Sequence, residues 1–342
     1  MEHKVFSIQH QSNEIQLIKS EFSDLLEFDL LQSQLEELFC IRKLKKTDGL
    51  EEAKDFMLKN SEYGSWVYFP WSNTALKILE KSEFIELRTS RNRNKISKIE
   101  QGRLSDKTIG IVGMSVGFSV FLSMVMERTA ENFKIADFDV LSMSNLNRLP
   151  FRLCDIGLQK VEIAKRWALE IDPYLKIQVF SEGVQDSNIE EFFIGNRRLD
   201  LVVDECDSGS VKLLLRLFAR KYRIPLLMET SDRGLLDVEN YQNVNEPLFH
   251  GRISDSEVEE LLSKSSNEVL MRFIDMSAAS KRGIDSMLEI GKTLDTWPQL
   301  ASDVFHGGAS VTIAARNILL GNTISSGRYF MDLQQKLGVH EL

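Results

Sequence analysis

This sequence has few of the residues that cross-link a chain or carry it across a membrane. Its three cysteines lie far apart with no CxxC pair, which excludes a disulfide framework and a four-thiolate zinc site. The most apolar stretch, 109–126, is interrupted by glycines and serines, so no transmembrane segment is expected. The N-terminus reaches polar residues without the apolar core of a secretory signal, and we therefore expect a cytoplasmic protein.

The sequence also has fewer basic than acidic residues. The 42 lysines and arginines face 51 aspartates and glutamates, which gives a formal net charge of −9 at pH 7. A duplex-DNA binder needs a basic surface for its phosphate contacts, so we expect no nucleic-acid partner. The apolar content of 43% in 342 residues suffices for two or three packed units, and any bound nucleotide is expected to be a small molecule.

The pattern of the chain changes along its length and predicts three regions. Residues 1–100 form a small N-terminal accessory α/β region, with helical periodicity at 22–31 and 76–84. Residues 101–240 form the central domain. Residues 241–342 form a mixed C-terminal extension, to which we assign substrate and dimer contacts.

Short apolar runs alternate with helical segments in the central domain. We predict strands at 108–112, 133–136, 177–180, 201–203 and 225–228, and helices near 118–127, 159–171 and 211–222. Parallel strands need crossover connections, and right-handed crossovers place helices on the faces of the sheet. The predicted fold class is therefore α/β, a Rossmann-like, mostly parallel sheet with helices on both faces. Farther along, a buried helix is expected over 309–320, stopped by Gly321.

The first of these strands ends in a loop of small residues. Gly113-Met-Ser115-Val-Gly117 runs into an apolar helix, where backbone N–H groups and the helix N-terminus can bind phosphate. Only Gly113 matches a G-x-G-x-x-G fingerprint. A structural turn and a nucleophile elbow with Ser115 as the nucleophile are equally open interpretations of this loop.

An aspartate follows at the end of the second predicted strand. Asp137 lies 20 residues past Gly117, a spacing at which a carboxylate can accept the hydroxyl hydrogens of a ribose. A capping or loop aspartate is the alternative. The spacing modestly favours a nucleotide site over a hydrolase elbow, which has no need of this residue.

Four motifs in order give the chain a family resemblance. Asp137-Phe-Asp-Val-Leu-Ser-Met-Ser-Asn-Leu-Asn-Arg148 is followed by Asp155-Ile-Gly-Leu-Gln-Lys160, by Ile171-Asp-Pro173 and by Asp204-Glu-Cys-Asp207. This region, about 105–235, resembles the ThiF-like adenylyltransferase superfamily, which includes molybdopterin-synthase adenylyltransferase and the ubiquitin-activating enzymes. The resemblance implies an ATP- and Mg²⁺-dependent enzyme that activates a carboxylate as an acyl-adenylate and releases pyrophosphate.

The resemblance also implies roles for individual residues. The residues expected to bind ATP are Gly113, Ser115, Gly117, Asp137, Ser144, Asn145, Arg148, Lys160, Asp207 and Ser208, with Asp137 on the ribose and Asp207 holding Mg²⁺. Arg93 lies in a segment similar to the family's R-x-N-R-Q-I, whose arginine reaches the ATP of the other subunit of a homodimer. We take Arg93, Arg148, Lys160 and Asp207 as the catalytic set.

The chemistry explains why such a set is needed. A carboxylate that attacks the α-phosphate brings two anions together, so the site must supply positive charge and exclude water. Each residue also has a simpler interpretation. Arg148 could be a surface residue, Lys160 a solvated helix position, and Asp207 the N-cap of the helix that follows.

Departures from the family pattern leave the function open in part. Ser115 and Val116 stand where the family usually has glycines, and after Asp204 the only cysteine is Cys206, so no thioester-forming cysteine and no zinc site are expected. The activated carboxylate belongs to a carrier-protein or peptide C-terminus or to a small molecule. A non-catalytic dimeric binding module is the second hypothesis, and an NAD-binding dehydrogenase the third.

After the last predicted strand, Glu229, Asp232 and Arg233 either contact the substrate or form a polar turn.

Overall fold

The computed structural model describes residues 2–44, 49–243 and 245–339. The chain divides into two compact units, Met1–Ile99 with Ala168–Leu175, and Glu100–Trp167 with Lys176–Leu342. Residues beyond 240 therefore belong to the same unit as the central domain. The regional boundaries at 100 and 240 stay predictions.

The smaller unit is built on a mixed sheet in the order β1-β3-β4-β2. Its strands are β1 (Lys4–Ser7), β2 (Leu26–Asp29), β3 (Ser65–Phe69) and β4 (Thr74–Ile78), and its helices are α1 (Ile8–Glu21), α2 (Leu31–Lys43), α3 (Gly49–Lys59), α4 (Lys81–Arg88) and η1 (Ser90–Asn92). The helices predicted at 22–31 and 76–84 are wrong over much of their length. There β2 pairs in parallel with β4, and pairing between strands outweighs the helical periodicity of both segments.

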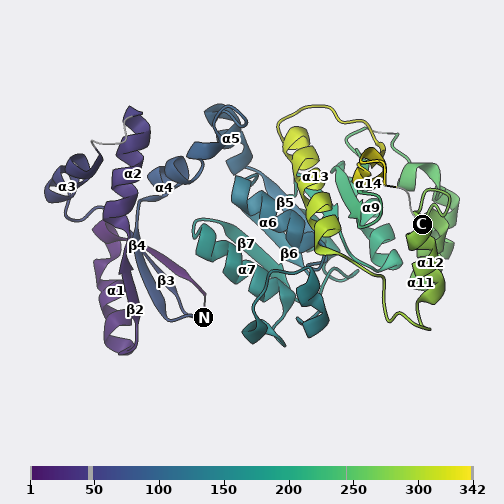
Figure 1. The fold of residues 1–342 in the computed structure, drawn as a ribbon, viewed down its shortest axis with the longest axis horizontal. Coiled ribbons are helices and arrows are strands. Elements are labelled where there is room, and N and C mark those ends of the chain that lie inside the picture. Colours follow the sequence, from purple (N-terminus) through teal and green to yellow (C-terminus); the bar gives the residue numbers. More distant parts are fainter. Residues whose placement is uncertain (1, 45–48, 244, 340–342) are drawn as a thin grey trace. The chain divides into compact units, whose positions relative to one another are not determined.

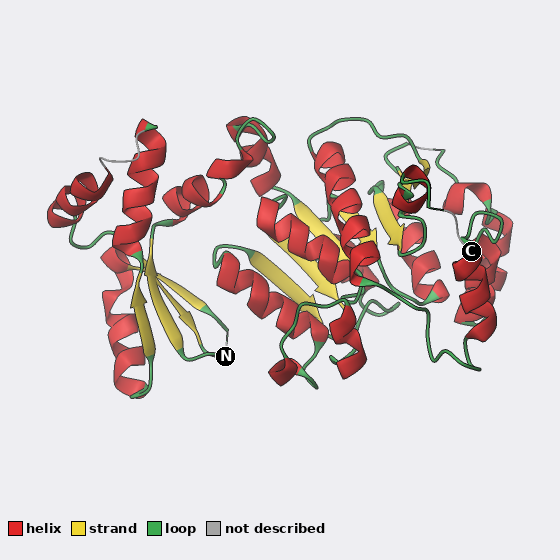
Figure 2. Ribbon diagram, in the orientation of Figure 1, coloured by secondary structure: helices red, strands yellow, loops and turns green. Residues whose placement is uncertain are grey.

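The larger unit contains the predicted Rossmann-like sheet. Its strands are β5 (Thr108–Val112), β6 (Asn132–Ala136), β7 (Lys176–Phe180), β8 (Leu201–Asp204), β9 (Leu226–Thr230), β10 (Leu235–Glu239) and β11 (Gly327–Phe330), in the order β11-β10-β9-β8-β5-β6-β7. Strands β5 to β9 pair in parallel, whereas β10 and β11 add an antiparallel edge that the sequence reading did not predict. Figure 2 shows the strands of this sheet in yellow among their helices.

Helices follow the strands at or near the predicted places. They are α5 (Lys98–Ser105), α6 (Gly117–Glu127), η2 (Met143–Asn147), η3 (Leu153–Asp155), α7 (Lys160–Ile171), α8 (Ile189–Ile194), α9 (Gly209–Tyr222), η4 (Leu248–Gly251), η5 (Asp255–Glu257), α10 (Val258–Leu262), α11 (Ser266–Phe273), α12 (Lys281–Glu289), α13 (Ala301–Leu319) and α14 (Leu333–Lys336). The predicted helices at 118–127, 159–171 and 211–222 are confirmed as α6, α7 and α9. Within the described ranges, no helix is both long and apolar enough to span a bilayer.

The strand order reverses between β5 and β8, and this reversal positions the site. The chain runs from β5 outward to β6 and β7, then returns to place β8 on the other side of β5. Every residue of β5 and β8 is buried, as expected for central parallel strands covered on both faces. In open α/β sheets, ligands bind outside the carboxyl ends of the strands at such a reversal.

Helix α13 packs closely along α6 (Figure 1), and it covers the helix predicted at 309–320 as far as Leu319. A Cβ at Gly308 would lie 2.7 Å from the backbone carbon of Ser119, so glycine is needed for the two helices to approach. The Ser119 hydroxyl donates a 2.8 Å hydrogen bond to the carbonyl of Val304. The end of the helix matches the sequence reading too, since Gly321 has φ +90° just past Leu319.

Candidate functional site

The turn after β5 is shaped by its contact with the end of β8. Gly113 has φ +91°, and its N–H donates to the carbonyl of Ala136 at the end of β6. A Cβ at position 113 would lie 2.6 Å from the carbonyl carbon of Glu205 and 2.9 Å from the nitrogen of Cys206. Glycine is therefore required here by the approach of β5 to β8, whether or not a ligand is bound.

Asp137, at the end of β6, ties the neighbouring turns together. One carboxylate oxygen accepts the N–H of Met114 at 2.5 Å, and the other accepts the N–H of Asp139 at 2.7 Å. Burial raises the pKa of Asp137, while these two hydrogen bonds and the nearby Lys160 ammonium act in the opposite direction. The aspartate thus fixes the loop after β5 against the loop after β6.

Lys160 begins α7 and is held by Asp139. Its ammonium lies 2.7 Å from the Asp139 carboxylate, and its backbone N–H donates to the Asp139 carbonyl at 3.0 Å. The Lys160 side chain is 5% exposed, so the alternative of a solvated helix position is wrong. The Lys160 ammonium has three N–H donors, and within the described residues it donates a hydrogen bond to Asp139 alone.

Arg148 lies next to the turn after β5. Its Nε donates to the hydroxyl of Ser115 at 3.2 Å, and its Nη1 donates to Asn147 Oδ1 at 2.9 Å and to the carbonyl of Ser144 at 3.4 Å. Burial lowers the pKa of the guanidinium, and the charge of the Asp207 carboxylate raises it. Arg148 is half-buried, so the alternative of a simple surface residue is wrong.

The remaining polar residues of the predicted set have local structural roles. Asn145 Oδ1 accepts the N–H of Ser142 in a capping box of η2. The Ser208 hydroxyl caps α9 by accepting the N–H of Val211. Since Ser208 is the N-cap, the alternative N-cap role for Asp207 is wrong.

The two aspartates of the Asp204-Glu-Cys-Asp207 motif differ in environment. Asp204 is fully buried, 3.1 Å from Lys212 Nζ and 2.6 Å from Arg216 Nη1. Burial alone would raise the pKa of Asp204, but these two cations hold it below its ordinary value. Asp207 is exposed and accepts no hydrogen bond within the described part of the chain.

Hydrogen bonds and charges join the predicted residues in two groups near the carboxyl ends of β5, β6 and β8. Ser115, Arg148 and Asp207 form one group, and Asp137 and Lys160 form the other. The two groups meet along the chain at Met114, which lies between Gly113 and Ser115 and donates its N–H to Asp137. Ser144 joins the first group through its backbone carbonyl, and Gly117 starts α6 directly after the turn. Arg93 lies in the smaller unit, 3.6 Å from Glu86, and its role stays a prediction.

The sequence alone predicted no role for Asp139 or Glu205, and for Glu229 it predicted either a substrate contact or a polar turn. Asp139 belongs to the motif that begins at Asp137. Its place just past the end of β6 is the signal that could have suggested a role beside Asp137. Glu205 is buried, and burial raises its pKa well above the ordinary value. Glu229 is 4% exposed, and within the described residues neither of its carboxylate oxygens has a hydrogen-bond partner.

The polar segment after β9 is used mainly inside the unit. Asp232 accepts the N–H of Ser280 at 2.9 Å, and Arg233 lies 2.9 Å from Asp332. These contacts match the polar-turn interpretation, and they leave a substrate contact for either residue a prediction.

The donors at the switch point fit a polyphosphate. Arg148 Nη2 has no partner among the described residues, and Lys160 has two further N–H groups. The N-terminus of α6 adds backbone N–H groups and partial positive charge. No group of three or more histidine, cysteine or acidic side chains is arranged for a metal in the described ranges, so a magnesium ion here would take Asp207 together with phosphate oxygens and water.

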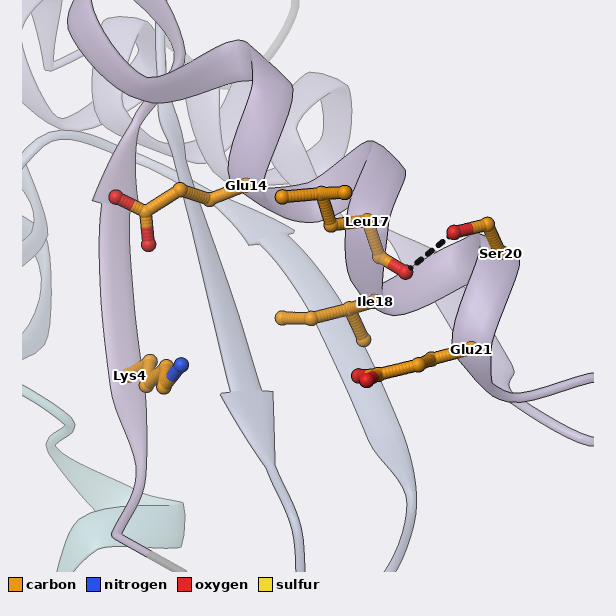
Figure 3. Close-up of a pocket in the computed structure, with 6 residues that line it drawn as sticks. All are labelled: Lys4, Glu14, Leu17, Ile18, Ser20 and Glu21. Carbon is orange, nitrogen blue, oxygen red and sulfur yellow. Dashed lines mark hydrogen bonds between the residues drawn. The ribbon is translucent and has the colours of Figure 1, made fainter.

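The smaller unit has a surface groove between β1 and α1 (Figure 3). It is lined by Lys4, Glu14, Leu17, Ile18, Ser20 and Glu21. The Ser20 hydroxyl donates to the carbonyl of Leu17. None of the predicted site residues lines this groove.

Comparisons with known proteins find the family that the four motifs resemble. Residues 89–234 match the ThiF family. An uncharacterized Mycobacterium tuberculosis protein, MT1398, is 37% identical over 309 residues, which are 88% of this chain and 41% of that protein. A probable molybdopterin-synthase adenylyltransferase of Porphyra purpurea is 33% identical over 116 residues, 34% of this chain and 30% of that protein.

The fold also resembles a solved structure. The Escherichia coli tRNA N6-threonylcarbamoyladenosine dehydratase TcdA, in complex with ATP, is similar with a TM-score of 0.51 and 16% identity, over 71% of this chain and 97% of that one. The chain spans less than half the length of the two relatives that it matches by sequence. The motifs, the sheet order and the matched segment together identify residues 89–234 as a ThiF family domain.

Proposed function

We propose that this chain is an ATP- and Mg²⁺-dependent adenylyltransferase that converts a carboxylate into an acyl-adenylate, in the cytoplasm and without a cysteine thioester step. The observation that carries the proposal is the placement of two cations beside the ends of β5 and β6: Arg148 binds Ser115 in the turn after β5, where the charge of Asp207 acts on it, and Lys160 binds Asp139 and acts on Asp137. Two cations with unfilled donors beside a free carboxylate suit a magnesium-bound triphosphate.

The reaction follows from this charge arrangement. A carboxylate oxygen of the substrate attacks the α-phosphorus of ATP, a new P–O bond forms, and the bond to the bridging oxygen breaks to release pyrophosphate. Arg148 and Lys160 offset the repulsion between the two anions and the charge that develops on the leaving group. Asp207 would hold a magnesium ion, which would supply further positive charge. Asp137 orients the ribose with the oxygen lone pairs that its backbone hydrogen bonds leave free.

We extend the proposal to the assembly and the substrate. The chain acts as a homodimer in which Arg93 of one subunit serves the ATP of the other, and the carboxylate belongs to a carrier-protein or peptide C-terminus or to a small molecule. The absence of a cysteine other than Cys206 after Asp204 supports direct transfer from the adenylate. The name of the Porphyra relative supports the adenylylation step.

Exchange of labelled pyrophosphate into ATP tests the reaction. We expect exchange with at least one member of a panel of carboxylates and carboxyl-terminal peptides, and a loss of about 100-fold or more in Arg148→Ala, Lys160→Ala and Asp207→Asn. Arg252→Ala is the control, because Arg252 pairs with Asp275 elsewhere in the same unit. Calorimetric titration with ATP and with NAD is the second measurement. Binding of NAD in place of ATP, or neither binding nor exchange, contradicts the proposal.

A further inference from the structure

Arg148 is held by neutral groups at one end of its guanidinium. Nε donates to the Ser115 hydroxyl, and Nη1 donates to Asn147 Oδ1 and the carbonyl of Ser144. Within the described residues, no carboxylate lies within ion-pair distance of this cation, although the charge of Asp207 acts on it from farther away. The positive charge of Arg148 is therefore oriented without being neutralised.

The other end of the guanidinium has unfilled donors. Arginine carries five N–H groups, and three of them are accounted for by the contacts of Nε and Nη1. The two N–H groups of Nη2 have no partner in the described part of the chain. A half-buried guanidinium with one satisfied edge and one free amino group is arranged to receive an anion from a fixed direction.

Ser115 is well placed to fix that direction. The residue before it, Met114, donates its N–H to Asp137, and the residue after it, Val116, is the N-cap of α6. The backbone of Ser115 is thus held on both sides, so its hydroxyl is a fixed acceptor.

We propose that Ser115 is a positioning residue, whose hydroxyl holds Nε of Arg148 so that Nη2 meets the phosphates of ATP. The proposal rests on the proposed function, because it needs ATP at this site. A glycine at position 115 would offer Nε of Arg148 no acceptor, so the guanidinium would lose this contact. In a glycine-rich loop, backbone N–H groups bind the phosphate. Here the contact between the Ser115 and Arg148 side chains would orient the group that binds it.

Titration calorimetry with Mg-ATP and with adenosine tests this role in the full chain. We expect Ser115→Ala and Ser115→Gly to weaken ATP binding by about tenfold and to change adenosine binding by less than about twofold, because one hydrogen bond to a charged group is lost. Ser123→Ala is the matched control, since it removes a hydroxyl from α6 that donates to the carbonyl of Ser119. That variant should bind ATP like the wild type.

A double-mutant cycle separates positioning from a general effect on the loop. If Ser115 acts through Arg148, Ser115→Ala should weaken ATP binding by less than about twofold in an Arg148→Ala background. A full tenfold loss in that background overturns the proposal. So does tighter ATP binding by Ser115→Gly, which would mean that close backbone approach matters more than the hydroxyl. Failure of the wild type to bind ATP would refute the proposed function itself, whereas equal ATP affinities of wild type and Ser115→Ala would refute the positioning role alone.

Discussion

Alanine at position 113 would meet two separate penalties in the turn that ends β5. Gly113 has φ +91°, a left-handed conformation that costs an L-residue about 1–2 kcal/mol. The new Cβ would also lie 2.6 Å from the carbonyl carbon of Glu205, and relieving such an overlap in a packed region costs about 1–3 kcal/mol. We therefore expect Gly113→Ala to lower the free energy of unfolding of the larger unit by about 2–5 kcal/mol.

Gly157 offers a matched control for the backbone term. Its φ of +89° is close to that of Gly113, but a Cβ there would have no atom within 4 Å. Gly157→Ala should lower the free energy of unfolding by only about 1–2 kcal/mol, the cost of the left-handed conformation. Urea unfolding followed by far-ultraviolet circular dichroism compares the two variants with the wild type. Equal destabilisation of both would refute the reasoning, because the overlap with the end of β8 would then cost nothing.

Two further predictions concern buried charges. Burial, together with the charge of Asp303, raises the pKa of Glu229 from its ordinary 4.5 to about 8 against the opposing effect of Lys212, so the folded state binds the proton more tightly. The free energy of unfolding should therefore fall as the pH rises from about 4.5 to about 8. Urea titrations at several pH values measure this dependence, and Glu229→Gln should make it weaker. An unchanged pH dependence in that variant would contradict the assignment. Lys134 donates to the carbonyls of Glu191, Phe192 and Gly195 at the end of α8. Lys134→Met should therefore cost about 3 kcal/mol by removing three hydrogen bonds, and thermal unfolding that matches the wild type would contradict this.

The larger unit could be predicted well from the sequence because its strands are buried on both faces. The run Thr108–Val112 contains no charged residue and does not alternate between polar and apolar positions, so its pattern differs from that of a half-exposed strand. The smaller unit was harder to predict. Strand β2, Leu26–Asp29, is exposed along its whole length and is defined by its pairing with β4, so its local composition carries no strand signal.

For the candidate site, the sequence predicted where the residues lie but not which side chains contact one another. Motif spacing placed Asp137, Arg148 and Lys160 at one end of the sheet, because residues after parallel strands meet at the same edge. It could not show that Asp139 holds Lys160 or that Ser115 holds Arg148. Those contacts join segments 21 and 33 residues apart, and they depend on side-chain directions that only the folded structure fixes.

The contrast between Asp204 and Asp207 has a consequence for mutational surveys of this chain. Asp204 is paired in the protein interior with Lys212 and Arg216, and Arg216 is paired with Glu239 as well, so removal of Asp204 leaves the buried Lys212 ammonium without its carboxylate. We therefore expect activity that is lost with Asp204 to report on folding. Asp207 faces solvent, so we expect its replacement to leave the architecture intact and, under the proposed function, to abolish adenylation. Variants at these two positions of one motif should therefore behave differently. Comparing an Asp204 variant with an Asp207 variant distinguishes loss of folding from loss of activity.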